Sequence, residues 1–160
     1  MQTMSKTKKM CFSGILIAMY VVVMYLTQGF AFGQYQMRVA TGFYSLAYFF
    51  PFLIVPLGLA NAVSNFFLGS FGVMDAIGGM LVGVLASGGV FLVRLLHFHA
   101  WLVIPIIIFI PGLIVPIWLS RFTGVPYLVL VLSLCIGQSL PAVLGYILVK
   151  ILPNLGVERL

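Results

Sequence analysis

Long stretches without a charged side chain are the feature that most constrains this chain. Only four of residues 10–149 are Asp, Glu, Lys or Arg: Arg38, Asp75, Arg94 and Arg121. A helix needs about 20 apolar residues to cross a bilayer, and each uncharged stretch, of 28, 36, 18, 26 and 28 residues, approaches or exceeds that length. Charged residues make up 6% of the chain, against about 25% in soluble domains. The sequence therefore predicts an all-α integral membrane protein and excludes a soluble nucleotide-binding or catalytic domain.

The number of spans depends on the 36-residue stretch, which contains Pro51 and Pro56. Proline cannot donate to a helical hydrogen-bond ladder, so we divide this stretch into two short helices. The result is a single membrane domain, residues 1–160, with a six-helix bundle whose spans cover about 10–32, 39–54, 56–71, 76–95, 101–119 and 126–150. The alternative is five spans, with one long kinked second helix.

The basic residues favour six spans. If the amino terminus is cytoplasmic, six spans place six Lys and Arg residues inside and only Arg38 and Arg121 outside, as the positive-inside rule requires. Five spans leave four basic residues on each side. We therefore predict a multi-pass protein of the cell membrane with both termini in the cytoplasm. The basic residues then set topology, and we expect the lipid membrane as a partner and no nucleic acid.

Chemistry that depends on acidic residues is nearly absent. Asp75 and Glu158 are the only carboxylate side chains, so paired-carboxylate catalysis is excluded. The sequence contains no P-loop and no HExxH motif. His97 and His99 lack a third ligand nearby, which favours loop histidines over a metal site. We expect neither an enzyme nor a bound metal or cofactor, but a protein that binds something and leaves the supply of energy to others.

Rare polar residues gather on the predicted outer side, next to aromatic ones. Polar side chains at membrane depth tend to be functional, and aromatic rings provide a rigid contact area for a planar ligand. The alternatives are that the arginines reach lipid headgroups, that Asp75 caps a helix, and that the aromatic residues face lipid or pack in the core. The candidate substrate-binding residues are Gln34, Tyr35, Gln36, Arg38, Phe43, Tyr44, Asn65, Phe67, Phe71, Asp75 and Arg121.

Small residues recur at helical spacing in two places. Gly14 and Ala18 lie four residues apart in the first predicted span. The fourth span carries a longer ridge made of Gly78, Gly79, Gly83 and Ala86. Such spacing lets membrane helices approach closely, so each set serves either internal packing or the docking of a separate subunit.

Two segments resemble a known family. The run GQYQMR at 33–38 is followed by an aromatic-rich helix, and residues 56–87 read PLGLANAVSNFFLGSFGVMDAIGGMLVGVLAS. These are similar to the QueT group of S components, the substrate-binding membrane subunits of energy-coupling factor (ECF) transporters, a type of ABC importer. The resemblance implies a six-helix subunit that captures a vitamin-like micronutrient outside. It also implies partners, namely a transmembrane coupling protein and two cytoplasmic ATPases, and assigns Gly14 and Ala18 to the surface that meets the coupling protein.

The resemblance leaves the substrate open. Members of the group typically carry an acidic residue soon after the loop arginine, but residues 38–43 read RVATGF here. A queuosine precursor presents a guanine-like donor edge and an amine, and Asp75 alone would have to bind both. The more aromatic, less acidic sequence favours a larger neutral ligand, and we expect cobalamin, with a queuosine precursor as the alternative. A membrane scaffold that binds no ligand is the second class of function.

Overall fold

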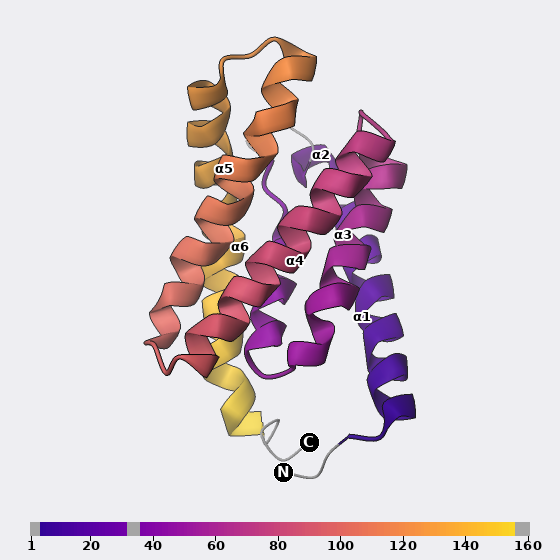
Figure 1. Cartoon of the computed structure of the whole chain (residues 1–160), viewed down its shortest axis with the longest axis vertical. Helices are drawn as coiled ribbons and strands as arrows, with labels where there is room; N and C mark the ends of the chain where they lie inside the picture. The colour runs from indigo at the N-terminus through magenta and orange to yellow at the C-terminus, as the bar shows by residue number, and fades with distance from the viewer. Residues whose placement is uncertain (1–3, 32–35, 156–160) are drawn as a thin grey trace.

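The computed structural model describes residues 4–31 and 36–155, and all regular elements of these residues are helical (Figure 1). The elements, with η marking 3₁₀ helices, are α1 (Lys6–Leu26), α2 (Gln28–Ala31), η1 (Val39–Tyr48), η2 (Pro51–Leu53), α3 (Ile54–Leu68), α4 (Val73–Leu95), η3 (Ala100–Leu102), α5 (Val103–Thr123), α6 (Tyr127–Ile151) and η4 (Leu152–Leu155).

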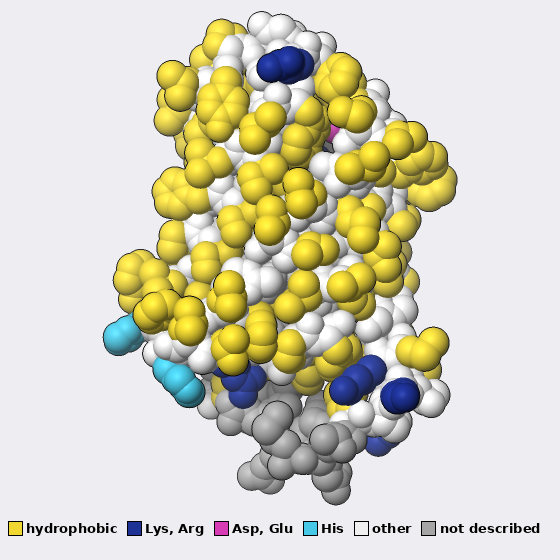
Figure 2. Space-filling view, in the orientation of Figure 1, with side chains coloured by type: hydrophobic (Ala, Val, Ile, Leu, Met, Phe, Trp, Pro, Cys, Tyr) yellow, Lys and Arg dark blue, Asp and Glu magenta, His cyan; other side chains and the backbone are white. Residues whose placement is uncertain are grey.

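Five helical segments of the described chain are long and apolar enough to cross a membrane. Apolar side chains cover the flank of the bundle in Figure 2, and Lys and Arg appear on that face only toward its two ends. A soluble protein would cover this flank with polar groups, whereas lipid accepts it. The prediction of an all-α membrane protein is therefore confirmed. The five segments are Lys6–Leu26, Pro51–Leu68, Val73–Leu95, Ala100–Thr123 and Tyr127–Leu155.

The expected count of six membrane helices is not confirmed, because residues 39–54 do not form one spanning helix. The ten residues of η1 extend about 20 Å at a 3₁₀ rise of about 2 Å per residue, which is short of the ~30 Å hydrocarbon core. The chain then turns at Phe49 and Phe50, and Pro51 starts η2. Most η1 side chains are buried, so this short element is enclosed by the longer helices.

Close backbone contact with α6 explains how η1 fits inside the bundle. A Cβ atom placed on Gly42 would lie 3.1 Å from the Pro141 carbonyl oxygen, and one on Gly145 would lie 3.1 Å from the Gly42 carbonyl oxygen. A side chain at either position would therefore push the two backbones apart by a few tenths of an ångström, which the two glycines avoid. In chain order, η1 follows α2 and precedes α3, and it returns the chain through the bundle. As a result, the start of α1 and the end of α6 lie at the same end (Figure 1). We call this the basal end.

The two sets of small residues have different surroundings. On α4, a Cβ on Gly83 would lie 2.8 Å from the Gly58 Cα of α3, and Gly78 and Gly79 are buried as well. This ridge is internal packing. Gly14 and Ala18 on α1 are exposed, and a Cβ on Gly14 would meet nothing within 4 Å.

Candidate functional site

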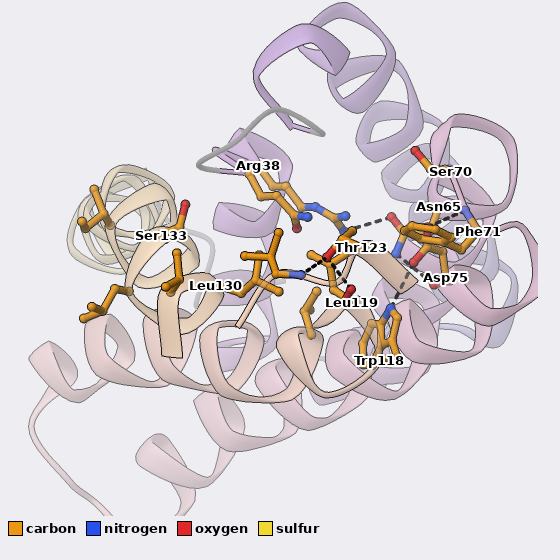
Figure 3. Close-up of a pocket in the computed structure, with 16 residues that line it drawn as sticks. Arg38, Asn65, Ser70, Phe71, Asp75, Trp118, Leu119, Thr123, Leu130 and Ser133 are labelled. Atoms are coloured by element: carbon orange, nitrogen blue, oxygen red, sulfur yellow. Dashed lines mark hydrogen bonds between the residues drawn. The ribbon is translucent and has the colours of Figure 1, made fainter. Parts of the chain in front are cut away.

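A cavity of about 580 Å³ lies at the end of the bundle opposite the basal end (Figure 3). It is enclosed by the segment before η1, the connection from α3 to α4, the end of α5 and the first turns of α6. Its volume lies within the ~300–1,000 Å³ typical of small-molecule sites. The lining residues are Gln36, Arg38, Asn65, Ser70, Phe71, Asp75, Val115, Trp118, Leu119, Thr123, Val125, Val129, Leu130, Leu132, Ser133 and Ile136.

Asp75 is fixed on the cavity wall by two donors. It lies in the first turn of α4 and is 8% exposed. The Phe71 backbone N–H donates to Oδ2 and the Trp118 indole Nε1–H donates to Oδ1, both at 3.1 Å. A Cβ on Gly69 would lie 2.7 Å from Oδ2, so the turn needs glycine here. Helix N-termini favour negative charge, which further stabilises the carboxylate in this place.

Asn65 connects Arg38 to the helix that carries Asp75 (Figure 3). Arg38 Nη1 donates to Asn65 Oδ1 at 2.9 Å, and Asn65 Nδ2 donates to the Asp75 carbonyl oxygen at 3.0 Å. Arg38 Nε also donates to the Ala31 carbonyl oxygen at 3.4 Å. Arg38 is 7% exposed and Asn65 is 2% exposed. A guanidinium and a carboxylate group are therefore held in one buried cluster.

A second set of buried polar groups joins η1 to α6. The Thr41 hydroxyl lies 2.7 Å from both the Arg38 carbonyl oxygen and Gln138 Oε1, and it can donate its single proton to one of them at a time. Gln138 Nε2 donates to the Gln36 carbonyl oxygen at 3.2 Å. Gln36 has a φ of 44°, a region that few residues other than glycine adopt. These bonds hold the Gln36–Arg38 segment against α6.

The rest of the cavity wall is mostly apolar and partly aromatic. Phe71 stacks on Phe122, with ring centroids 4.9 Å apart and an angle of 23° between the planes. The Trp118 ring packs on Gly78, where a Cβ atom would lie 2.5 Å from the indole. Two aromatic rings next to a carboxylate suit a flat ligand that carries hydrogen-bond donors at one edge.

The structure brings together five of the residues expected from the sequence. Gln36, Arg38, Asn65, Phe71 and Asp75 all line the cavity. Gln34 and Tyr35, the two other expected residues from the same loop, lie outside the described residues.

Four expected residues do not line the cavity. Tyr44 is fully buried and its hydroxyl oxygen lies 3.2 Å from that of Tyr20, while Phe43 packs with its ring centroid 6.4 Å from that of Tyr20. Phe67 is 74% exposed, and Arg121 is exposed near the end of α5. The structure thus places the first pair in the core and the second pair on the surface.

Sequence reasoning missed the contributions of α5 and α6. Trp118 binds the carboxylate, Thr123 and Ser133 line the cavity, and Gln138 holds the η1 segment. The available signal was that Gln138 is the one amide side chain of the uncharged stretch 122–149, and polar side chains at membrane depth tend to be functional. Among the described residues, no three His, Cys, Asp or Glu side chains come together as a metal site would require.

Comparison with known proteins identifies the family. No curated protein and no solved structure matches the chain. The sequence does match the family model described as QueT transporter, over residues 10–154. This match covers nearly the whole chain and indicates a transporter component with several membrane helices, not a typical enzyme. The chain belongs to the QueT transporter family.

Proposed function

We propose that this protein is the substrate-binding S subunit of an ECF-type importer and that it captures a queuosine precursor, a 7-deazaguanine base, in the cavity beside Asp75. One observation carries the proposal, namely the buried carboxylate on the wall of a cavity in a QueT-family chain. The cavity end faces the outside in this proposal, and the basal end, with its lysines, faces the cytoplasm as the positive-inside rule favours.

Cobalamin, the substrate that the sequence favoured, is not supported. The family match fits a queuosine precursor better. A cavity of about 580 Å³ can hold a bicyclic base, since small-molecule sites have volumes of about 300–1,000 Å³. No acidic residue follows Arg38 closely, which suggested a neutral, larger ligand, but the buried Asp75 carboxylate lies on the cavity wall and can accept hydrogen bonds from a base.

The Asp75 carboxylate supplies what the donor edge of a deazaguanine needs. A carboxylate can accept about four hydrogen bonds, and described residues donate two of them. A guanine-like edge presents a ring N–H next to an amino group, a pair that one carboxylate can accept together. Phe71 and Trp118 offer aromatic surface for the flat base. A pure scaffold would have no use for this arrangement.

The charges of the site favour an uncharged precursor. Arg38 and Asp75, one basic and one acidic residue, line the same cavity, so their formal charges cancel. An ammonium group would have to enter a mostly apolar space beside a guanidinium, at a desolvation cost. We therefore expect a precursor that carries an uncharged nitrile group to bind at least as well as one that carries an aminomethyl group, which would bring the ammonium into the cavity.

Calorimetric titration of purified protein with both precursors, guanine and cobalamin tests the proposal. We expect binding of the precursors and none of cobalamin. Asp75→Asn should weaken precursor binding by at least about tenfold, the scale of one charge-assisted hydrogen bond. Thermal melting in the same detergent establishes that the variant is folded. Equal affinity of folded Asp75→Asn and wild type, or tighter binding of cobalamin, would refute the assignment.

The partner assignment rests on α1. The exposed Gly14 and Ala18 leave a flat strip on which another membrane helix can pack closely. We propose that the transmembrane coupling protein docks here and that two ATPase subunits bound to it supply the energy, since the chain itself has no nucleotide-binding motif.

A further inference from the structure

A second cavity, of about 520 Å³ and more open to the surroundings than the first, lies at the basal end of the bundle. Its walls come from the end of η1 and from the last turns of α4 with the loop that follows. It shares no lining residue with the first cavity, the one beside Asp75, which we call the substrate cavity because of the proposed function. The lining residues are Tyr48, Phe91, Arg94, Leu95, His97 and Phe98.

One backbone carbonyl group and two aromatic rings hold Arg94 in this cavity, and these contacts use few of its N–H donors. Its Nη1 donates to the Tyr48 carbonyl oxygen at 3.1 Å. Its guanidinium carbon lies 5.7 Å from the centre of the Tyr48 ring and 5.2 Å from that of Phe49. A guanidinium has five N–H donors in a planar fork that matches phosphate. The described chain fixes the position of this fork without an acidic partner, since Asp75, the one described carboxylate side chain, lies at the other end.

His97 occupies a backbone conformation in which glycine would be more favourable. It follows the C-cap of α4 with a φ of 56°, where a residue with a Cβ atom is strained and glycine is common. Residues in such sparsely populated conformations cluster at ligand-binding and other functional sites. Here the imidazole lines the cavity next to Arg94, and a neutral imidazole offers one N–H donor.

The remaining walls distinguish a lipid from a free anion. Phe91, Leu95 and Phe98 are apolar, and the last two are more than half exposed on the flank of the bundle. A hydrated inorganic phosphate gains nothing from such a surface, whereas the acyl chains of a phospholipid do. Lys6, Lys8, Lys9 and Lys150 lie at the same end, which adds to the attraction for an anionic membrane surface.

We propose that this basal cavity binds one anionic phospholipid, with the phosphate accepting hydrogen bonds from Arg94 and His97 and the acyl chains lying along Phe91, Leu95 and Phe98. Because Arg94 also holds the last carbonyl group of η1, the bound lipid buttresses the element that begins next to Arg38 in the substrate cavity. The proposal concerns a separate site and does not depend on which substrate the protein carries.

Native mass spectrometry of the purified full chain tests this proposal. Phosphatidylglycerol and phosphatidylcholine with identical acyl chains are titrated separately, and retention of one lipid is measured. We expect phosphatidylglycerol to be retained in preference, and Arg94→Gln to weaken its retention about tenfold. The matched control is Lys150→Gln, which removes one charge at the same end outside the cavity and should change retention by less than about twofold.

His97→Gly separates binding from folding. Glycine suits the backbone at this position, so the melting temperature should be maintained or raised, while lipid retention falls several-fold with the loss of the imidazole donor. The proposal is wrong if His97→Gly retains lipid as wild type does, or if Arg94→Gln behaves like Lys150→Gln. Displacement of the lipid by an equal concentration of inorganic phosphate would also overturn it, since the site would then recognise the free anion.

Discussion

Gly79→Ala tests whether Asn65 organises the substrate cavity. Gly79 lies on α4 and is buried against α3. A Cβ atom there would collide with Asn65 Nδ2 and lie 3.1 Å from Asn65 Cγ and 3.2 Å from the Asn61 carbonyl oxygen. The amide group must therefore move, and its 3.0 Å bond to the Asp75 carbonyl oxygen cannot persist.

The magnitude follows from the bonds that Asn65 makes. A buried amide donor left unpaired costs about 1–3 kcal/mol of stability, and overpacking adds a cost of the same order. The shift also displaces Arg38, which Asn65 holds at 2.9 Å. If Arg38 contributes one charge-assisted hydrogen bond to the ligand, its displacement weakens binding by about tenfold.

Two other glycines of α4 serve as controls. Gly83→Ala overpacks the backbone of α3, with its Cβ 2.8 Å from Gly58 Cα, so it should lower the melting temperature without changing ligand affinity. Gly88→Ala meets nothing within 4 Å and should gain up to about 1 kcal/mol of helix stability. Thermal melting and ligand titration of all three variants separate the effect on stability from the effect on ligand affinity. If Gly79→Ala and Gly83→Ala have the same Kd, the role assigned to Asn65 is refuted.

Three further predictions use other parts of the chain. Trp118→Phe removes the indole donor to Asp75 and should raise the Kd of the ligand about fivefold, and an unchanged Kd in calorimetry would mean that the indole does not position the carboxylate. Gly14→Leu fills the exposed strip of α1 and should abolish co-purification with the coupling protein while ligand affinity stays the same; surviving co-purification places the docking surface elsewhere. In a cysteine-free background, Arg121→Cys should react with an impermeant thiol reagent added outside intact cells and Lys150→Cys should not, and the reverse pattern contradicts the orientation.

Isolated polar residues made much of the cavity predictable from the sequence. Arg38 and Asp75 are two of the four charged residues between residues 10 and 149, and Asn65 is one of few amides there; the cost of burying a polar group in a membrane means that such residues find one another or a ligand. The structure brings these three together through direct hydrogen bonds. Their role in binding a substrate stays a prediction.

The positions of aromatic residues were less predictable, because the sequence around an aromatic residue looks the same whether its side chain faces the membrane interface, the core or a ligand. Near the end of a span, such a residue is typical of the interfacial belt, of the core or of a ligand site. Phe67 and Trp118 both lie in the last third of their helices, yet Phe67 is 74% exposed and Trp118 donates to a buried carboxylate. Only the packing of α4 against α5, through Gly78, separates them.

The second element is shorter than the spanning helix predicted for residues 39–54, and this difference accounts for the depth of the cavity. The apolar residues 39–54 are compatible with a spanning helix or a buried short one, since both are hydrophobic on all sides. A regular span would have raised Arg38 to the membrane surface, where its guanidinium would be hydrated. Instead, η1 is about 20 Å long, about 10 Å less than a ~30 Å hydrocarbon core, between the turn at Phe49 and its first residue, Val39. Arg38 immediately precedes that residue, and this is why it lies within the bundle, buried beside Asn65. The 3₁₀ helix thus leaves the space that the cavity beside Asp75 occupies and places a guanidinium in its wall.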